Sequence, residues 1–144
     1  MALEQSPMRL AGGWPNWVTE APYVASAHPQ AADLPPICEG ANCQRYAYGI
    51  LSLFGLQVSP HRSSELWSDV SLEHMQVADA HDLDLVLFNE TDHAWGAHVA
   101  VVLGSRLLHL CAEEGVPAAW TWDAFASRER YARVVGVLRV GVSE

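Results

Sequence analysis

The amino-acid sequence predicts a single α+β domain over residues 1–144, with helices in the first half and an antiparallel set of strands in the second. Three observations lead to this class. Half of the residues are apolar and 17% are charged, as in compact globular domains. The first strongly periodic segment has helical spacing, whereas later apolar segments are β-branched and end at turn residues. These helices and strands do not alternate, which distinguishes α+β from α/β order.

The chain begins with a lead-in rich in proline and tryptophan. We expect residues 1–20 to be irregular, with one short helix near Trp17. A separate domain is not expected at this length. Any long element before residue 37 is interrupted by prolines, namely Pro15, Pro22, Pro29, Pro35 and Pro36.

The strongest helical signal runs from Asn42 to Phe54. Asn42 is a good N-cap, because its side chain can accept a hydrogen bond from an unpaired first-turn N–H. Gly55 is a good C-terminal stop. Cys43 therefore occupies the first helical position. One apolar face is formed at helical spacing by Ala47, Ile50, Leu51 and Phe54.

A second, short helix is expected from Ser63, with Ser63 as its N-cap and Trp67 within it. The tight turn Gly104-Ser105 predicts a hairpin between two of the strands that follow. In chain order these later elements are strands over Leu83–Phe88, Ala97–Leu103 and Arg106–Cys111, a helix over Trp122–Arg130 capped by Thr121, and a closing strand over Val134–Val140.

The excess of acidic over basic residues argues against a polyanionic partner. Lys and Arg number 8 against 17 Asp and Glu, a formal net charge of -9, so a nucleic-acid partner is not expected. The first residues contain no basic region followed by an apolar run, so no signal peptide is expected. No apolar stretch approaches the ~20 residues needed to cross a bilayer. We expect a cytoplasmic protein with no membrane span, and export by a signal-independent route stays open.

The chain has three cysteines, Cys38, Cys43 and Cys111, so at least one cannot pair within the chain. The spacing of Cys38 and Cys43 is a poor match to structural zinc sites, and we expect no metal and no cofactor. At a helix start, the dipole and the unpaired amides lower the pKa of a thiol. Cys43 could therefore be a nucleophile, and the alternative from position alone is a buried structural thiol.

Histidines on two neighbouring strands could supply a base. His98 shares a strand face with Ala100, and His109 shares one with Leu107. If the hairpin brings both imidazoles to the same side, one can act as general base to the thiol while the other orients it. The alternative is that each is a satisfied core histidine. Trp95 could form a lip of the cleft, although core packing is the commoner role of tryptophan.

Five segments resemble motifs of the NlpC/P60 family of cysteine hydrolases, in the family's order and with compatible spacing. The resemblance covers about residues 21–140. The segments are Gly40–Tyr46 around the nucleophile, Pro60–Ser64, Ala80–Phe88, Ala97–Gly104 with the base, and Leu107–Leu110 with the third polar residue.

The resemblance implies a papain-like core in which a nucleophile-bearing helix packs on an antiparallel β-sheet. It implies hydrolysis of an amide bond in a bacterial cell-wall stem peptide or related γ-glutamyl peptide, so the expected ligand is a peptide or muropeptide. Cys43 would be the nucleophile that forms an acyl-enzyme, His98 the base and His109 the orienting residue. Tyr23, in Pro22-Tyr23-Val24, would be the substrate-side tyrosine.

Two residues beside the nucleophile depart from the family's pattern. Asn42 replaces the usual Asp, and Gln44 replaces a small Ser at a position that lines the substrate cleft in the family. A catalytically altered binding or modifying module with a ligand other than peptidoglycan is therefore the second interpretation. An acyltransferase of the related permuted group is disfavoured, because its histidine precedes its cysteine, whereas Cys43 precedes His98.

Overall fold

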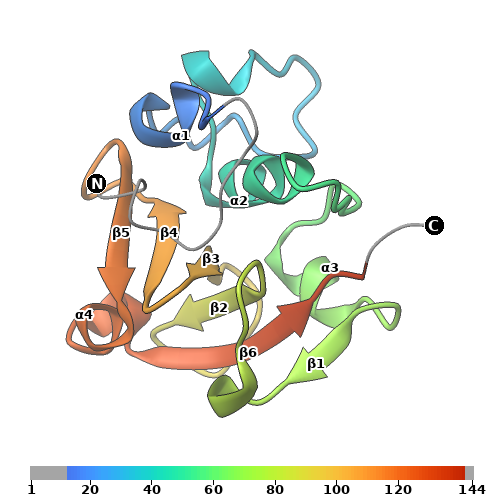
Figure 1. The fold of residues 1–144 in the computed structure, drawn as a ribbon, viewed down its shortest axis with the longest axis vertical. Helices are drawn as coiled ribbons and strands as arrows, with labels where there is room; N and C mark the ends of the chain where they lie inside the picture. The colour runs from blue at the N-terminus through green and yellow to red at the C-terminus, as the bar shows by residue number, and fades with distance from the viewer. Residues whose placement is uncertain (1–12, 142–144) are drawn as a thin grey trace.

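The computed structural model of the protein describes residues 13–141 (Figure 1). Its helical segments and strands follow the predicted α+β order, and the α+β class is confirmed. Of the predicted lead-in, residues 13–20 carry the expected short helix, and residues 1–12 lie outside the described part. The elements are α1 (Trp17–Glu20), η2 (Ile37–Glu39), α2 (Cys43–Ser52), α3 (Ser63–Ser68), β1 (Glu73–Met75), η3 (Val77–Asp79), β2 (Leu85–Asn89), β3 (His98–Leu103), β4 (Arg106–Leu110), β5 (Pro117–Thr121), α4 (Trp122–Ala126), η4 (Glu129–Tyr131) and β6 (Arg133–Arg139).

The strands form one antiparallel sheet in the order β1-β6-β2-β3-β4-β5. Strands β2 to β5 follow one another, whereas β6, the last strand in the chain, lies between β1 and β2. The predicted two-residue turn joins β3 to β4, with Gly104 in the left-handed region and Leu103 paired with Arg106. Figure 1 shows β4 and β5 running steeply across the direction of β2 and β6, so the sheet is strongly twisted.

Both faces of the sheet are covered, because alternate side chains of its central strands enter two different apolar clusters. On β3, Val99 packs in the same cluster as Ile50 of α2. Ala100 faces the opposite way, into an aromatic cluster that includes Phe125 of α4 and Tyr131 of η4. Helix α2 therefore covers one face, and the α4–η4 segment covers the other.

Helix α2 begins where the sequence predicts and ends at Ser52, two residues before the predicted end at Phe54. The side chain of Asn42 accepts a first-turn N–H at 2.9 Å, and Cys43 is the first helical residue. At the other end Gly55 has a φ of +79°, and the N–H of Leu56 donates to the carbonyl of Leu51. This is the hydrogen-bond pattern of a glycine-terminated helix.

Other boundaries differ from expectation. Ser63 is not the N-cap of α3, because Arg62 holds that position. The Ser63 hydroxyl is buried and instead donates to the carbonyl of Ala97. The helix expected over Trp122–Arg130 ends at Ala126, and a separate turn, η4, follows it.

Strands β1 and β5 carry no strand signal in the sequence. β5 begins at a proline and contains two alanines, which are poor predictors of a strand. Pairing with β4, in which Leu107 lies opposite Trp120, holds this segment in the extended conformation that its own residues do not favour. Trp120 therefore lies on a strand that the sequence analysis does not predict.

Candidate functional site

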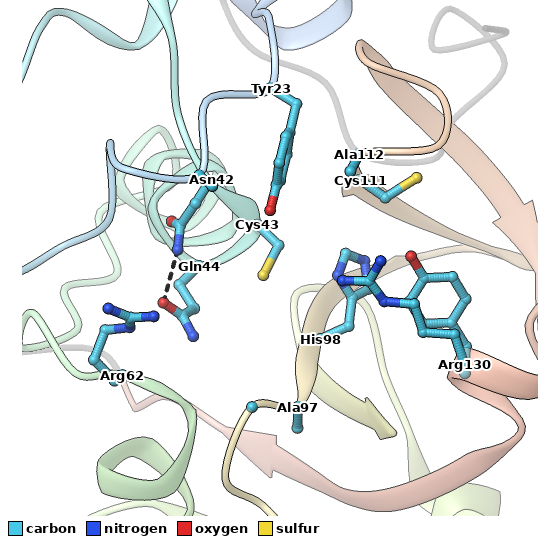
Figure 2. A pocket seen from close by; sticks show the side chains of 13 residues that line it. Tyr23, Asn42, Cys43, Gln44, Arg62, Ala97, His98, Cys111, Ala112 and Arg130 are labelled. Carbon is cyan, nitrogen blue, oxygen red and sulfur yellow. Dashed lines mark hydrogen bonds between the residues drawn. The ribbon is translucent and has the colours of Figure 1, made fainter. Parts of the chain in front are cut away.

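A cavity of about 150 Å³ lies where the start of α2 meets the start of β3 (Figure 2). Its walls come from segments that are far apart in the sequence. Most of its lining belongs to Tyr23, residues 42–44, Arg62, residues 96–98, residues 111–112 and residues 130–131. The structure thus brings the predicted nucleophile and base to one cavity.

Cys43 and His98 face each other across this cavity. Figure 2 shows the Sγ of Cys43 and the imidazole of His98 beside each other, across a gap. No hydrogen bond joins the thiol to this ring among residues 13–141. Such contacts are often long in a ligand-free site and shorten when a substrate binds.

The two predicted histidines are hydrogen-bonded to each other. Nε2 of His98 lies 2.9 Å from Nδ1 of His109, and the rings are nearly perpendicular. The register that pairs Val102 with Leu107 puts His109 one step along the same face from His98. Because His109 engages Nε2 of His98, Nδ1 is the nitrogen left to face the thiol.

This geometry sets the tautomers that a general base requires. For Nδ1 of His98 to accept a proton, its Nε2 must carry the hydrogen and donate it to His109. His109 then carries its own hydrogen on Nε2, a buried atom with no hydrogen-bond partner among the described residues. The imidazole of His109 is packed among aromatic rings, with its centroid 4.2 Å from that of Trp120 and 4.6 Å from that of Phe125. A buried N–H without an acceptor costs stability, so His109 points to a role other than stabilising the fold.

Burial controls the charge of both imidazoles. It lowers the pKa of His98 to about 3, with a smaller contribution from the positive charge of Arg130. It lowers the pKa of His109 to about 2, and His98 adds to this shift. Both rings are therefore neutral at neutral pH.

Burial also raises the pKa of the Cys43 thiol. Hydrogen bonds with the backbone of Val99 and Gln44 and the charges of Arg130 and Arg62 oppose this shift without cancelling it. The expectation that the helix start lowers the pKa of this thiol is wrong, because loss of solvation outweighs the helix terminus. The free site holds a neutral thiol and a neutral imidazole.

Gln44 lines the cavity, but its side chain is engaged within the protein. Its carbonyl accepts from the amide of Asn42 at 2.9 Å, and its own amide donates to the Ser63 hydroxyl at 2.7 Å. Ser63 donates in turn to the carbonyl of Ala97. This hydrogen-bonded chain ties the starts of α2, α3 and β3 together. A contact between Gln44 and substrate stays a prediction.

Tyr23 lies at the cavity, held by a short parallel bridge to Ala41. Figure 2 shows its hydroxyl directed toward Cys43. Burial, and the proximity of Cys43, raise the pKa of the Tyr23 phenol. At neutral pH it is an uncharged hydrogen-bond donor beside the thiol.

Trp95 lies outside this cavity, and its side chain is 81% exposed. The expectation of core packing for this residue is wrong. It lines a neighbouring cleft of about 630 Å³ together with Trp67 and Asn89. The two cavities share Gly96 and Arg130, so Trp95 borders the site without entering it.

Two further residues of the lining, Arg130 and Tyr131, carry no signal in the sequence. The Tyr131 hydroxyl donates to the Glu113 carboxylate, and Arg130 pairs with the same carboxylate at 2.8 Å. The sequence places Arg130 inside a continuous helix, and only the break after Ala126 turns it toward the cavity. Arg62 also lines the cavity, and its one sequence signal is its place in the motif-like segment Pro60–Ser64.

The described part of the chain contains no group of three or more His, Cys, Asp and Glu side chains placed to hold a metal ion. Its helices are all too short or too polar to cross a membrane. The chain matches no model of a known protein family, and a search of curated proteins finds no match to it.

Proposed function

We propose that this protein is a cysteine hydrolase that cleaves an amide bond through an acyl-enzyme on Cys43. One observation supports this most. Cys43 of α2 and His98 of β3 line one cavity, and His109 of β4 engages Nε2 of His98 from outside that lining. The resemblance of five segments to NlpC/P60 motifs favours a cell-wall stem peptide or related γ-glutamyl peptide as substrate.

In the proposed reaction, Nδ1 of His98 takes the thiol proton while Sγ of Cys43 attacks the carbonyl carbon. The oxyanion accepts a hydrogen bond from the backbone N–H of Cys43 at the start of α2. The Tyr23 hydroxyl is a further donor at the same place. The imidazolium then gives its proton to the leaving nitrogen as the C–N bond breaks.

The second half of the reaction repeats the proton transfer with water. His98 removes a proton from water, the resulting hydroxide attacks the thioester, and the acid product leaves Sγ, which regains the proton. Because thiol and imidazole are both neutral before attack, His98 acts as a general base during the attack and not within a preformed ion pair.

The test is incubation with defined muropeptides and γ-glutamyl peptides, with products identified by mass spectrometry. We expect cleavage by the unmodified protein and a loss of at least about 10³-fold in Cys43→Ala and in His98→Ala. Cys38→Ala is the matched control, since Cys38 is an exposed thiol on η2. Cleavage that persists in Cys43→Ala would contradict the proposal.

The raised pKa of the Cys43 thiol favours a second candidate, a binding module of the same fold without turnover. For that function we expect a muropeptide to bind without release of product. Isothermal titration calorimetry would then give the same affinity for Cys43→Ala as for the unmodified protein. An acyl-enzyme adduct detected by intact-protein mass spectrometry would exclude this candidate.

A further inference from the structure

The cavity at Cys43 is positively charged in a strongly acidic protein. The chain has 17 Asp and Glu against 8 Lys and Arg. Among the described residues that line the cavity, the charged side chains are two arginines, Arg62 and Arg130, and no carboxylate belongs to this lining. Figure 2 shows the two guanidinium groups on opposite sides of the Cys43 sulfur.

Arg62 differs from the other arginines of residues 13–141. Nothing in this part of the structure accepts a hydrogen bond or forms an ion pair with its guanidinium. Each of the others has a partner: Arg45 the carbonyl of Gly40, Arg106 the carbonyl of Ala119, Arg128 the ring of Trp120, Arg130 the carboxylate of Glu113, Arg133 that of Asp92, and Arg139 that of Asp84. The Glu65 carboxylate is nearby and accepts from the backbone N–H of Arg62 at 3.0 Å, but the guanidinium donors of Arg62 remain available to a ligand.

Arg130 is positioned by the protein itself. The Glu113 carboxylate accepts from its Nη1, and the Tyr131 hydroxyl holds the same carboxylate from the other side. A guanidinium has five N–H donors in a rigid fork, so donors remain for a second acceptor. Glu113 neutralises part of this charge, and Arg62 adds a guanidinium without an ion-pair partner among the described residues.

Two further features favour a negative group at this place. The ten-residue helix α2 begins at the cavity, where Asn42, Cys43 and Gln44 form part of the lining, so its positive end lies there. Both arginines also act on Cys43 itself, since each lowers the pKa of its thiol. The charges therefore lie close enough to the reacting sulfur to act on a group bonded to it or bound beside it.

We propose that this cavity selects a substrate whose acyl part carries a carboxylate near the scissile carbonyl, held between Arg62 and Arg130. The proposal rests on the proposed function in taking Cys43 as the attacking atom. A monoanion matches the charge better than a phosphate dianion, because Glu113 already offsets part of Arg130. The planar guanidinium fork also matches the geometry of a carboxylate.

The test uses two alkylating probes of similar size that differ in charge, iodoacetate and iodoacetamide. In both reactions Sγ displaces iodide and forms a thioether, so both require the same thiolate. The ratio of the two rates therefore cancels the thiol's pKa and reports the field at the sulfur. Cys38, exposed on η2, is the reference thiol within the same molecule, and peptide mass spectrometry reads both sites.

At low salt we expect the iodoacetate-to-iodoacetamide rate ratio at Cys43 to exceed that at Cys38 by about tenfold. Arg62→Gln and Arg130→Gln should each lower it by about threefold, and added salt should lower it further. Arg106→Gln is the matched control, because Arg106 lies away from the cavity, and its ratio should not change. Circular dichroism of each variant checks that it is folded.

A ratio at Cys43 equal to that at Cys38, or one that neither cavity substitution alters in a folded variant, would overturn the proposal. In a second arm, glutarate should protect Cys43 from iodoacetamide more than phosphate does at equal ionic strength. Protection by phosphate alone would overturn the assignment to a carboxylate. Neither arm requires hydrolysis, so this proposal and the proposed function can fail independently.

Discussion

The environment of each reactive atom decides its chemistry at the scale of the residue. Cys43 has the helix-start position that lowers the pKa of a thiol, yet its poor solvation raises that pKa. His98 loses its charge for the same reason and becomes a neutral acceptor. In the proposed reaction this pair transfers the proton during attack, which makes the orientation of His98 by His109 important.

The two histidines should make stability depend on pH. Their pKa values are about 3 and about 2 in the folded protein against 6.5 for an ordinary histidine, so the unfolded state binds more protons below pH 6.5. Their contribution is complete above pH 6.5 and is lost as the pH falls toward 3. Between pH 7 and pH 5 we expect the free energy of unfolding to fall by about 2 kcal/mol for each ring. Urea unfolding at the two pH values measures this.

A double substitution, His98→Leu with His109→Leu, provides the control for this pH dependence. It replaces both partners of one buried hydrogen bond by apolar groups and removes the unpartnered Nε2, so it should cost little stability at pH 7. Most of the difference between pH 7 and pH 5 should disappear in this variant. An unchanged difference would show that other groups cause it.

At the scale of the element, the start of α2 is joined to the starts of α3 and β3 by the chain Asn42, Gln44, Ser63 and Ala97. Each link is buried, so each donor depends on its acceptor. This arrangement explains why Asn stands at the N-cap. Only its amide can cap the helix with oxygen and donate to Gln44 with nitrogen.

Asn42→Asp should therefore destabilise the protein, although Asp is as good an N-cap as Asn. A carboxylate cannot donate to the carbonyl of Gln44, so two oxygens would face each other at a distance of 2.9 Å. We expect a loss of about 1–3 kcal/mol in the free energy of unfolding, measured by urea denaturation.

A double-mutant cycle isolates this interaction. In a Gln44→Ala background, where the facing carbonyl is gone, Asn42→Asp should be close to neutral. An equal cost of Asn42→Asp in both backgrounds would mean that the loss arises at the helix cap and not from the link to Gln44.

At the scale of the whole molecule, β6 unites the two halves of the sheet. It pairs with β1 on one side and β2 on the other, and Trp67 of α3 packs against one of its faces. The contact is close at Gly136, where an added Cβ would lie 2.0 Å from the ring of Trp67. Glycine at this position lets the aromatic ring lie directly on the strand backbone.

Gly136→Ala should destabilise the fold by about 1–3 kcal/mol, because the Trp67 ring must shift away from β6. Thermal unfolding followed by circular dichroism measures the effect. The matched control is Gly141→Ala, where no atom of residues 13–141 lies within 4 Å of the added Cβ and little change is expected. Combining Gly136→Ala with Trp67→Leu should recover part of the loss, and no recovery would place the clash elsewhere.

Features set by a few neighbouring residues could be predicted from the sequence. The capping oxygen of Asn42, the left-handed glycine after α2 and the turn at Gly104 each act within one turn of the chain. The alternation of β3 and β4 likewise placed His98 and His109 on one face of the sheet. The motif-like spacing added the choice of Cys43 among three thiols, and the structure brings that thiol to the same cavity.

The rest depends on segments that meet only in the folded protein. β5 becomes a strand through its pairing with β4, and Arg130 reaches the cavity through a break after α4 that the local pattern does not indicate. Gln44 links the starts of α2 and α3 because the Ser63 hydroxyl lies within hydrogen-bond distance of its amide. The protonation state of Cys43 also depends on the tertiary structure, because its desolvation is caused by all the segments that surround it. Capping and turn preferences, by contrast, act within a few neighbouring residues. By itself the sequence determined which thiol and which imidazoles to consider, and the tertiary structure decided their protonation and the positive charge around them.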